Sequence, residues 1–165
     1  MGSQVARPAP SATLRILPGD CHVVDYPDVE LATTLGSCVA ACVRDPVAGV
    51  GGMNHFMLPK SDNGLWGPDQ ASLRFGNFAM KQLIDSILAR GGRRDRLEVK
   101  LFGGANLRGA GANIGWENAR YAEAYIAAAG LTVAARHLYG SLPRLIRYMP
   151  MTGKAFMLEL SDEED

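Results

Sequence analysis

The sequence predicts an α+β domain with a mostly antiparallel or mixed, sandwich-like β-sheet core and flanking helices. Three observations favour this fold class. Short apolar segments separated by turn residues recur along most of the chain, and two longer segments have helical periodicity. The two kinds of segment do not alternate regularly, as they would in a doubly wound parallel sheet. The 165 residues are enough to form one hydrophobic core.

Composition narrows the class of protein. Hydrophobic residues make up 47% and charged residues 21% of the chain, which is typical of a globular protein. Lysine plus arginine and aspartate plus glutamate number 17 each, so there is no general electrostatic attraction to nucleic acid or to an anionic membrane. No apolar run has the length of a membrane span, and the N-terminus lacks the apolar region of a secretory signal. The odd number of cysteines, 3, indicates free thiols, so we expect a cytoplasmic protein.

The first half of the chain predicts a series of short strands. Residues 38–44 are almost all apolar or small, which is typical of a strand buried on both faces. Gly51 and Gly52 indicate a bulge or a close backbone approach in a later strand. The predicted strands are 13–17, 21–25, 30–35, 38–44 and 50–58.

The second half predicts both helices and the remaining strands. Apolar residues at helical spacing favour a helix over 71–90, which ends at Gly91, and a second over 116–129, which ends at Gly130. Residues 1–12 are expected to form a flexible lead-in, 13–160 a single domain and 161–165 an acidic tail. The remaining predicted strands are 97–102, 131–136, 144–149 and 155–160.

A cysteine and a histidine are predicted to meet across a hairpin. If residues 45–48 form the loop between strands 38–44 and 50–58, Arg44 pairs with Gly49 and Cys38 lies directly opposite His55. Directly opposed residues share a face, with Cβ atoms roughly 4.5–5.5 Å apart. This register predicts that the Cys38 thiol and the His55 imidazole are in contact.

Such a pair is the minimum equipment for nucleophilic catalysis by a thiolate. The imidazole takes the thiol proton, and backbone N–H groups of the Gly36-Ser37 turn before Cys38 are expected to hold the oxyanion of a tetrahedral intermediate. A third polar group must orient the imidazole. Thr33, Thr34 and Asn54 are the candidates, although Asn54 adjoins His55 in the strand and so points to the opposite face.

Several motifs resemble those of one family. The stretch Thr33-Thr34-Leu35-Gly36-Ser37-Cys38-Val39-Ala40, followed by Asp45-Pro46 and then Gly52-Met53-Asn54-His55-Phe56-Met57-Leu58-Pro59, resembles CheD, the chemoreceptor glutamine deamidase family. The resemblance extends from residue 14 to residue 160. It also covers Pro18-Gly19-Asp20, Phe102-Gly103-Gly104-Ala105-Asn106, Ile114-Gly115-x-x-Asn118 and Pro150-x-Thr152-Gly153.

The resemblance implies a cytoplasmic, deamidase-like cysteine hydrolase. Such an enzyme converts selected glutamines of methyl-accepting chemotaxis receptors to glutamate through a Cys–His–Thr triad and a thioester. Carried over, Cys38 is the nucleophile, His55 the general base and Thr33 the third member, with Thr34 in reserve. Gly36 and Ser37 support the oxyanion. Two alternatives stay open: a non-catalytic docking module for receptors and the chemotaxis phosphatase CheC, or a methylesterase that acts on receptor glutamyl esters.

No cofactor or metal is expected. Cys38, Cys42 and His55 do not have the spacing of a usual zinc site, and a fourth ligand is not evident. We expect Cys42 to be a core residue. Gly103-Gly104-Ala105-Asn106 lacks the lysine of a phosphate-binding loop, so it is expected to form a turn that lines the catalytic cleft.

Overall fold

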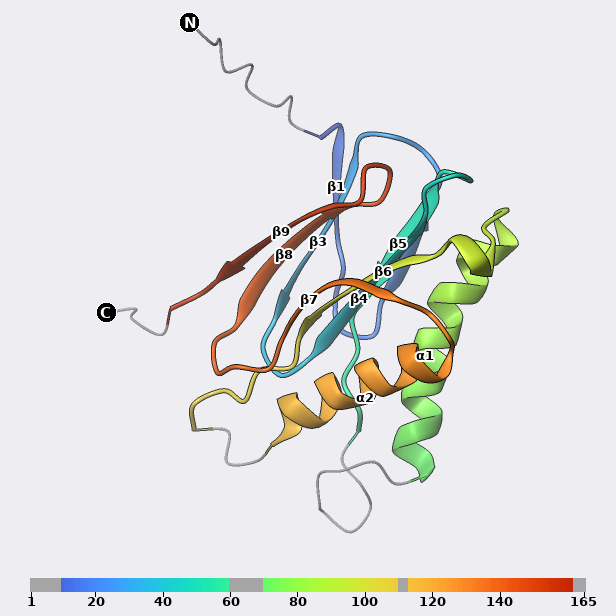
Figure 1. The fold of residues 1–165 in the computed structure, drawn as a ribbon. Coiled ribbons are helices and arrows are strands. Elements are labelled where there is room, and N and C mark those ends of the chain that lie inside the picture. The colour runs from blue at the N-terminus through green and yellow to red at the C-terminus, as the bar shows by residue number, and fades with distance from the viewer. Residues whose placement is uncertain (1–9, 60–69, 110–112, 162–165) are drawn as a thin grey trace, which may run out of the picture.

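Two β-sheets and two helices form three layers (Figure 1). The computed structural model describes residues 10–59, 70–109 and 113–161. Most of the predicted lead-in (residues 1–9) and of the acidic tail (residues 162–165) lies outside them. The α+β fold with a sandwich-like, mixed sheet core is confirmed.

The first sheet has four strands in the order β1-β3-β8-β9. Strand β1 pairs in parallel with β3, whereas the other neighbours are antiparallel. Both helices lie on the far side of the second sheet, so no helix of the described residues covers the outer face of the first (Figure 1). Its strands are β1 (Ala12–Arg15), β3 (Val29–Leu35), β8 (Arg144–Met149) and β9 (Lys154–Glu159).

The second sheet has five strands in the order β2-β5-β4-β6-β7 and forms the middle layer. Only β6 and β7 pair in parallel. Glycines 51 and 52 mark a close approach rather than a bulge, since a Cβ on either would collide with the neighbouring strand. The strands are β2 (Cys21–Val24), β4 (Val39–Asp45), β5 (Val50–Asn54), β6 (Glu98–Gly103) and β7 (Val133–Leu138).

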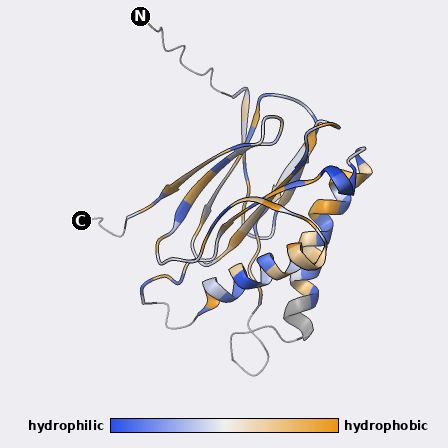
Figure 2. Cartoon of the chain, in the orientation of Figure 1, coloured by the Kyte–Doolittle hydropathy of each residue, from blue (hydrophilic) through white to orange (hydrophobic). Residues whose placement is uncertain are grey.

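Two helices cover one face of the second sheet. Helix α1 (Gln70–Ala89) packs on β2, β4 and β5, and α2 (Ile114–Ala128) packs on β4, β6 and β7. A short 3-10 helix (Arg94–Arg96) precedes β6. Hydrophilic and hydrophobic residues alternate along α2 and along the coloured part of α1 (Figure 2). None of the helices in the described ranges is long and apolar enough to cross a membrane.

Strand β4 is buried on both faces, as predicted. Val39, Ala41 and Val43 pack toward the helices, whereas Ala40 and Cys42 pack toward the first sheet. The molecule therefore has two hydrophobic clusters, one on each side of the middle sheet. The cluster between the two sheets is the one that contacts the predicted catalytic cysteine.

The predicted register of the β4–β5 hairpin is wrong by two residues. Asp45 pairs with Val50, so the loop is residues 46–49 and Asp45 is the last residue of β4. Its carboxylate accepts hydrogen bonds from the backbone N–H groups of Val47 and Ala48, and its carbonyl accepts one from Gly49 at 3.0 Å. Gly49 has φ +71°, a conformation that favours glycine. A carboxylate that closes the turn from within the strand thus shifts the pairing.

The buried Asp45 carboxylate also ties the hairpin to the segment before β6. Its other oxygen accepts hydrogen bonds from the Arg93 N–H at 2.8 Å and the Arg96 side chain at 2.9 Å. Burial of the carboxylate acts to raise its pKa. The hydrogen bonds from Ala48, Arg93, Arg96 and Val47 outweigh burial and lower the pKa to about 2. The charged form therefore stabilises the fold.

Replacing this carboxylate should destabilise the protein. We expect Asp45→Asn to lower the free energy of unfolding by about 2 kcal/mol, because the charged acceptor is lost. The contribution of Asp45 should be complete above about pH 5 and should disappear as the pH falls toward 2, since the unfolded carboxylate binds protons first. Urea denaturation at several pH values measures both effects. Asp95→Asn, at a side chain that is 64% exposed, is the control, and equal losses in the two variants would contradict the assignment.

Candidate active site

Thr33 and His55 join the two sheets through a buried hydrogen bond. Thr33 lies in the middle of β3, and its Oγ1 is 2.7 Å from His55 Nδ1. The same hydroxyl donates to the Ile16 carbonyl at 2.7 Å. Thr34, the reserve candidate, alternates to the outer face of the sheet and is exposed. Of the two threonines, Thr33 is therefore the one that contacts the imidazole.

These contacts determine which imidazole nitrogen carries the proton. The Thr33 hydroxyl has one hydrogen, and the Ile16 carbonyl can only accept it. The hydroxyl oxygen must then accept from His55, which places the hydrogen of the neutral ring on Nδ1. Nε2 is left with a free lone pair. His55 is thus held in the tautomer in which Nε2 can take a proton.

His55 lies just beyond the end of β5, which is shorter than predicted. The Ala41 N–H donates to the Asn54 side chain at 2.9 Å, and His55 instead exchanges backbone hydrogen bonds with Gly19 and Asp20. Burial of the ring lowers its pKa, and the Ile16 carbonyl and the Asp20 charge oppose this effect only in part. His55 is therefore a neutral base near pH 7. Asn54, another candidate to orient the ring, does not contact it. The Asn54 side chain accepts from the Ala41 N–H and donates to the Ala79 carbonyl of α1.

Cys38 is not directly opposite His55, and that prediction is corrected. The residues after each of them, Val39 and Phe56, form a bridge with two hydrogen bonds of 2.9 Å. Cys38 and His55 are therefore diagonal neighbours, a relation with Cα atoms roughly 7–8 Å apart that side chains can span. Cys38 packs against the cluster between the sheets, and His55 reaches Thr33 across the same space. Both side chains thus lie on one face of the middle sheet.

The turn before Cys38 is held from behind by three hydrogen bonds. The carbonyls of Gly36, Ser37 and Cys38 accept from the Ala105 N–H at 3.1 Å, the Asn118 side chain at 2.8 Å and the Gly104 N–H at 2.9 Å. The backbone N–H groups of Ser37 and Cys38 have no partner among the described residues. A regular ladder would pair the Cys38 N–H with the Gly104 carbonyl, but the strand pairing ends at Gly103. Both donors are thus available to an anionic oxygen.

Asn118 connects the two segments that carry Cys38 and His55, a contact that the sequence does not predict. Its amide nitrogen donates to the Ser37 carbonyl, and its oxygen accepts from the Leu58 N–H at 2.9 Å. One buried side chain of α2 thereby links the segments that follow His55 and precede Cys38. The available signal was an amide at the helical spacing of Ala122 and Ile126, on one face of a predicted helix.

Burial of the site favours the protonated form of the Cys38 thiol. Burial raises the pKa of Cys38, and burial lowers that of His55. Both shifts favour a neutral thiol–imidazole pair over the thiolate–imidazolium pair that the sequence suggested. The arrangement can therefore add sulfur to a carbonyl carbon with proton transfer to His55 during the attack, rather than from a preformed thiolate.

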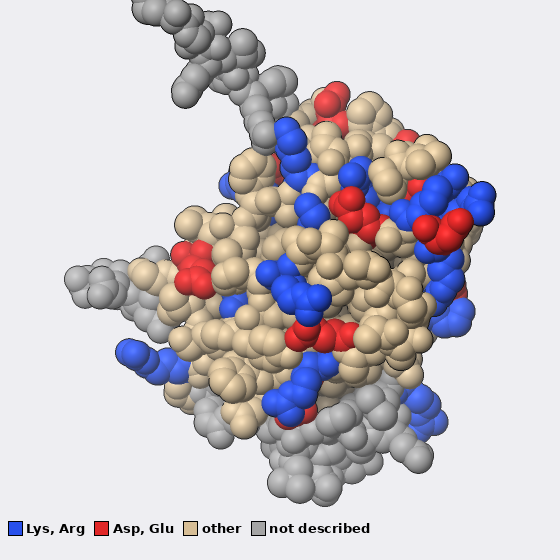
Figure 3. Space-filling model, viewed as in Figure 1, with Lys and Arg blue, Asp and Glu red and all other residues tan. Residues whose placement is uncertain are grey.

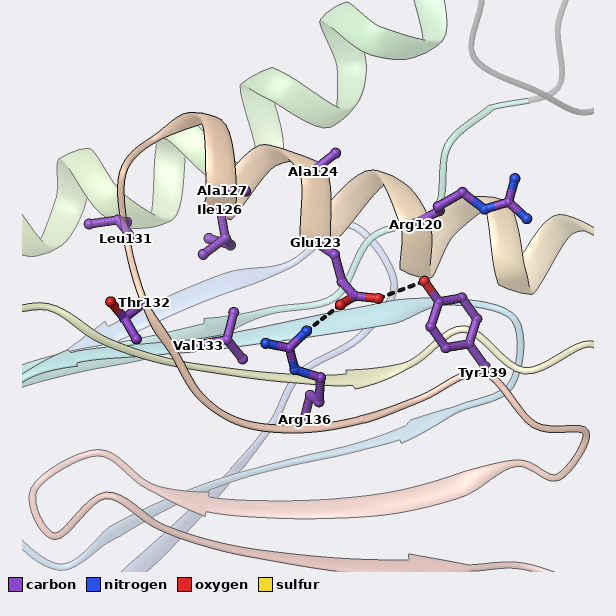
Figure 4. A pocket seen from close by; sticks show the side chains of 10 residues that line it. All are labelled: Arg120, Glu123, Ala124, Ile126, Ala127, Leu131, Thr132, Val133, Arg136 and Tyr139. Atoms are coloured by element: carbon purple, nitrogen blue, oxygen red, sulfur yellow. Dashed lines mark hydrogen bonds and ion pairs between the residues drawn. The ribbon is translucent and has the colours of Figure 1, made fainter.

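Hollows in the surface do not by themselves identify this site. A cavity of about 110 Å³ is lined by His55 and Asn54, and also by Phe75 and Phe78 of α1. A wider one of about 660 Å³ lies between α2 and β7, where Glu123 contacts Arg136 and Tyr139 (Figure 4). None of the predicted site residues lines the wider cavity. Within the described ranges, no three His, Cys, Asp or Glu side chains gather so as to hold a metal ion.

Comparison with known proteins identifies relatives of the chain. The family described as "CheD chemotactic sensory transduction" matches residues 57–159. A probable chemoreceptor glutamine deamidase CheD of Rhodopseudomonas palustris is 53% identical over 151 residues, which are 92% of this chain and 71% of the relative. A protein of the same description in Halorhodospira halophila is 48% identical over 145 residues, 86% of this chain and 67% of the relative.

One solved structure shows a distant likeness. The hypothetical protein YfiH of Bacillus licheniformis has a TM-score of 0.47 and 14% identity, over 74% of this chain and 50% of its own. This likeness adds nothing to the assignment of the site.

The tautomer of His55 can be measured directly. In ¹⁵N NMR spectra near pH 7 we expect His55 Nδ1 to carry the hydrogen, and the ring to protonate only below the ordinary pKa of about 6.5. Thr33→Val should release the tautomer because the acceptor is gone, whereas Thr34→Val should not. A neutral ring protonated on Nε2 in the wild type would contradict the assignment.

A second prediction follows from the raised pKa of the Cys38 thiol. Alkylation of Cys38 by iodoacetamide, followed by peptide mass spectrometry, should be slow at pH 7 and should still rise above pH 8.5, the approximate pKa of an ordinary thiol. His55→Gln should keep this profile. A rate that is already constant between pH 6 and 7 would instead reveal a preformed ion pair.

Proposed function

Because the chain belongs to the CheD family, we propose that it hydrolyses the side-chain amides of selected glutamines in methyl-accepting chemotaxis receptors, giving glutamate and ammonia. One observation supports this reaction most strongly. The Thr33 hydroxyl donates to the Ile16 carbonyl, so it accepts the hydrogen of His55 Nδ1. Nε2 of His55 is then the nitrogen that can accept a proton, and Cys38 packs on the same side of the middle sheet. Amide hydrolysis through a thioester requires a thiol nucleophile and a correctly oriented general base.

In the first step, Nε2 of His55 takes the proton of the Cys38 thiol while the sulfur attacks the amide carbon of the glutamine. The carbonyl oxygen becomes an oxyanion, which the N–H groups of Ser37 and Cys38 stabilise. Gly36 precedes these donors, and a Cβ there would lie 2.9 Å from the end of the Leu107 side chain, which would have to move. When the tetrahedral intermediate collapses, the carbon–nitrogen bond breaks and the imidazolium donates its proton to the departing ammonia.

In the second step, a water molecule hydrolyses the thioester. Nε2 of His55, neutral again, takes a proton from the water as its oxygen attacks the acyl carbon. The carbon–sulfur bond breaks, the receptor side chain leaves as glutamate, and the sulfur regains a proton from the imidazolium. Thr33 holds the ring in one orientation through both steps. It does so as a neutral acceptor, which stabilises the imidazolium less than a carboxylate would.

We propose the cytoplasm as the place of action and CheC as a second partner. All three cysteines are free thiols, which suits a reducing compartment. Basic and acidic side chains are interspersed on the face shown in Figure 3, so nucleic acid is not proposed as a partner. Family membership supports the CheC interaction. A pull-down with purified CheC should succeed equally with wild type and Cys38→Ala, and absence of binding in both would refute it.

Activity on a receptor cytoplasmic fragment tests the proposed function. We expect ammonia release and conversion of glutamine to glutamate by mass spectrometry, and no activity in Cys38→Ala. His55→Gln should lower kcat about 10³-fold and Thr33→Val about 10²-fold, as for a general base and the group that orients it. Thr34→Val is the matched control and should resemble wild type.

Two results would count against this proposal. Full deamidation by Cys38→Ala would exclude the thioester route. Release of methanol from a methylated fragment, without release of ammonia from the amide fragment, would favour the methylesterase alternative.

A further inference from the structure

Arg144 is a buried cation that has no ion-pair partner in the described part of the chain. It begins β8, and only 1% of its surface is exposed. Its guanidinium donates to the backbone carbonyls of Gly103, Tyr139 and His137, the last at 3.1 Å. No carboxylate of the described residues forms a salt bridge with it, and its Nε is buried without a partner. The Glu159 carboxylate interacts with the guanidinium only electrostatically, without a salt bridge, and acts to raise the pKa of Arg144.

Such a residue is costly to keep for packing alone. A buried charge that lacks a counter-ion loses its hydration, and an apolar side chain of similar size fills the same space at lower cost. The three carbonyls that converge on Arg144 therefore indicate a positional role. They come from the ends of β6 and β7, next to the turn that carries Cys38.

The path from Arg144 to Cys38 consists of a single peptide unit. The Gly103 carbonyl, which accepts from the guanidinium, and the Gly104 N–H belong to the same peptide group. That N–H donates to the Cys38 carbonyl at 2.9 Å. Because hydrogen bonds at the two ends of one peptide group reinforce each other, the guanidinium strengthens the contact with Cys38.

This peptide unit needs to be held. It lies between two glycines with φ +107° and +70°, and glycine permits reorientations that other residues resist. A side chain at Gly103 is not possible, since a Cβ there would overlap the Cys38 carbonyl. If the peptide turned over, its oxygen would face the Cys38 carbonyl and the turn would lose its support. The flexibility that allows the close approach therefore requires a lock on the Gly103 carbonyl.

Tyr139 shows how strongly the arrangement is constrained. It is not a glycine, yet its φ is +70°, a conformation that costs free energy and persists only where the surroundings impose it. Its N–H donates to the Gly103 carbonyl at 3.1 Å and its carbonyl accepts from Arg144. Its ring packs edge-on against Trp116 with centroids 5.9 Å apart, and its hydroxyl contacts Glu123 at 2.6 Å (Figure 4). Tyr139 and Arg144 thus hold the same carbonyl from two directions.

We propose that Arg144 is a positioning residue that locks the Gly103–Gly104 peptide and so keeps the backbone N–H of Cys38 directed at the oxyanion of the reaction. The proposal rests on the proposed function for its catalytic consequence. Its structural part is that Arg144 keeps the Gly104 N–H hydrogen-bonded to the Cys38 carbonyl, and this part does not depend on the proposed function.

The test compares Arg144→Met and Arg144→Lys with Arg147→Met. Arg147 lies in the same strand but points outward, and its side chain is 56% exposed. Arg144→Lys keeps the charge and guards against failure of Arg144→Met to fold, but a lysine lacks the planar fork that reaches several carbonyls. We expect both Arg144 variants to lower kcat about 10²-fold or more, the effect of losing one oxyanion donor, with KM changed less than about threefold. Arg147→Met should match wild type.

Alkylation of Cys38 by iodoacetamide distinguishes positioning from general loosening. That reaction forms no oxyanion, so its rate in the folded Arg144 variants should stay within about twofold of wild type. Equal losses of deamidation and alkylation, or an unchanged kcat, would overturn the proposal.

Hydrogen exchange tests the lock without using the activity. The Gly104 amide should exchange at least about tenfold faster in the Arg144 variants than in wild type and Arg147→Met. Unchanged exchange would overturn the proposal even if wild type is active. Faster exchange in a protein whose wild type releases no ammonia would uphold the lock, while the proposed function itself would fail.

Discussion

Three consecutive carbonyls of the turn Gly36–Cys38 accept hydrogen bonds from one side, and the geometry of the site depends on this constraint. Because the carbonyls are held from behind, the N–H groups of Ser37 and Cys38 remain free of partners among the described residues. The constraint in turn requires Gly103, where a Cβ would overlap the Cys38 carbonyl, and Gly104, where a Cβ would collide with Gly115 and Ala119 of α2. It also requires α2 to lie where Asn118 reaches both Ser37 and Leu58. The turn thus links β4, β6 and α2.

The catalytic group proposed here spans the two sheets. Thr33 comes from the first sheet, whereas His55 and Cys38 come from the segments next to β5 and β4 of the second, middle sheet. The hydrophobic cluster between the sheets therefore sets the distance between the base and the residue that orients it. The same burial raises the pKa of the thiol and lowers that of the imidazole, so it favours the neutral pair over the ion pair.

The sequence predicted the fold class, the strand buried on both faces and the hairpin between Cys38 and His55, because each depends on local patterns of apolar and turn residues. It did not predict the register, because Asp45 closes the turn from within β4 and is held by Arg93 and Arg96 from a distant segment. Nor did it reveal that Asn118 and Arg144 bind backbone carbonyls. Such contacts join segments far apart in the chain and leave no periodic signal. Alternation along β3 distinguishes Thr33 from Thr34 only once the inner face is known.

In the proposed reaction, Cys38, activated by His55, forms a thioester with a glutamine side chain of a chemotaxis receptor. Acid quenching of wild-type protein mixed with a receptor cytoplasmic fragment, followed by mass spectrometry of the peptide that contains Cys38, tests it most directly. We expect a covalent adduct on Cys38 that hydroxylamine releases and that Cys38→Ala lacks. Receptor glutamate that accumulates without any adduct on Cys38, and equally in Cys38→Ala, would contradict it.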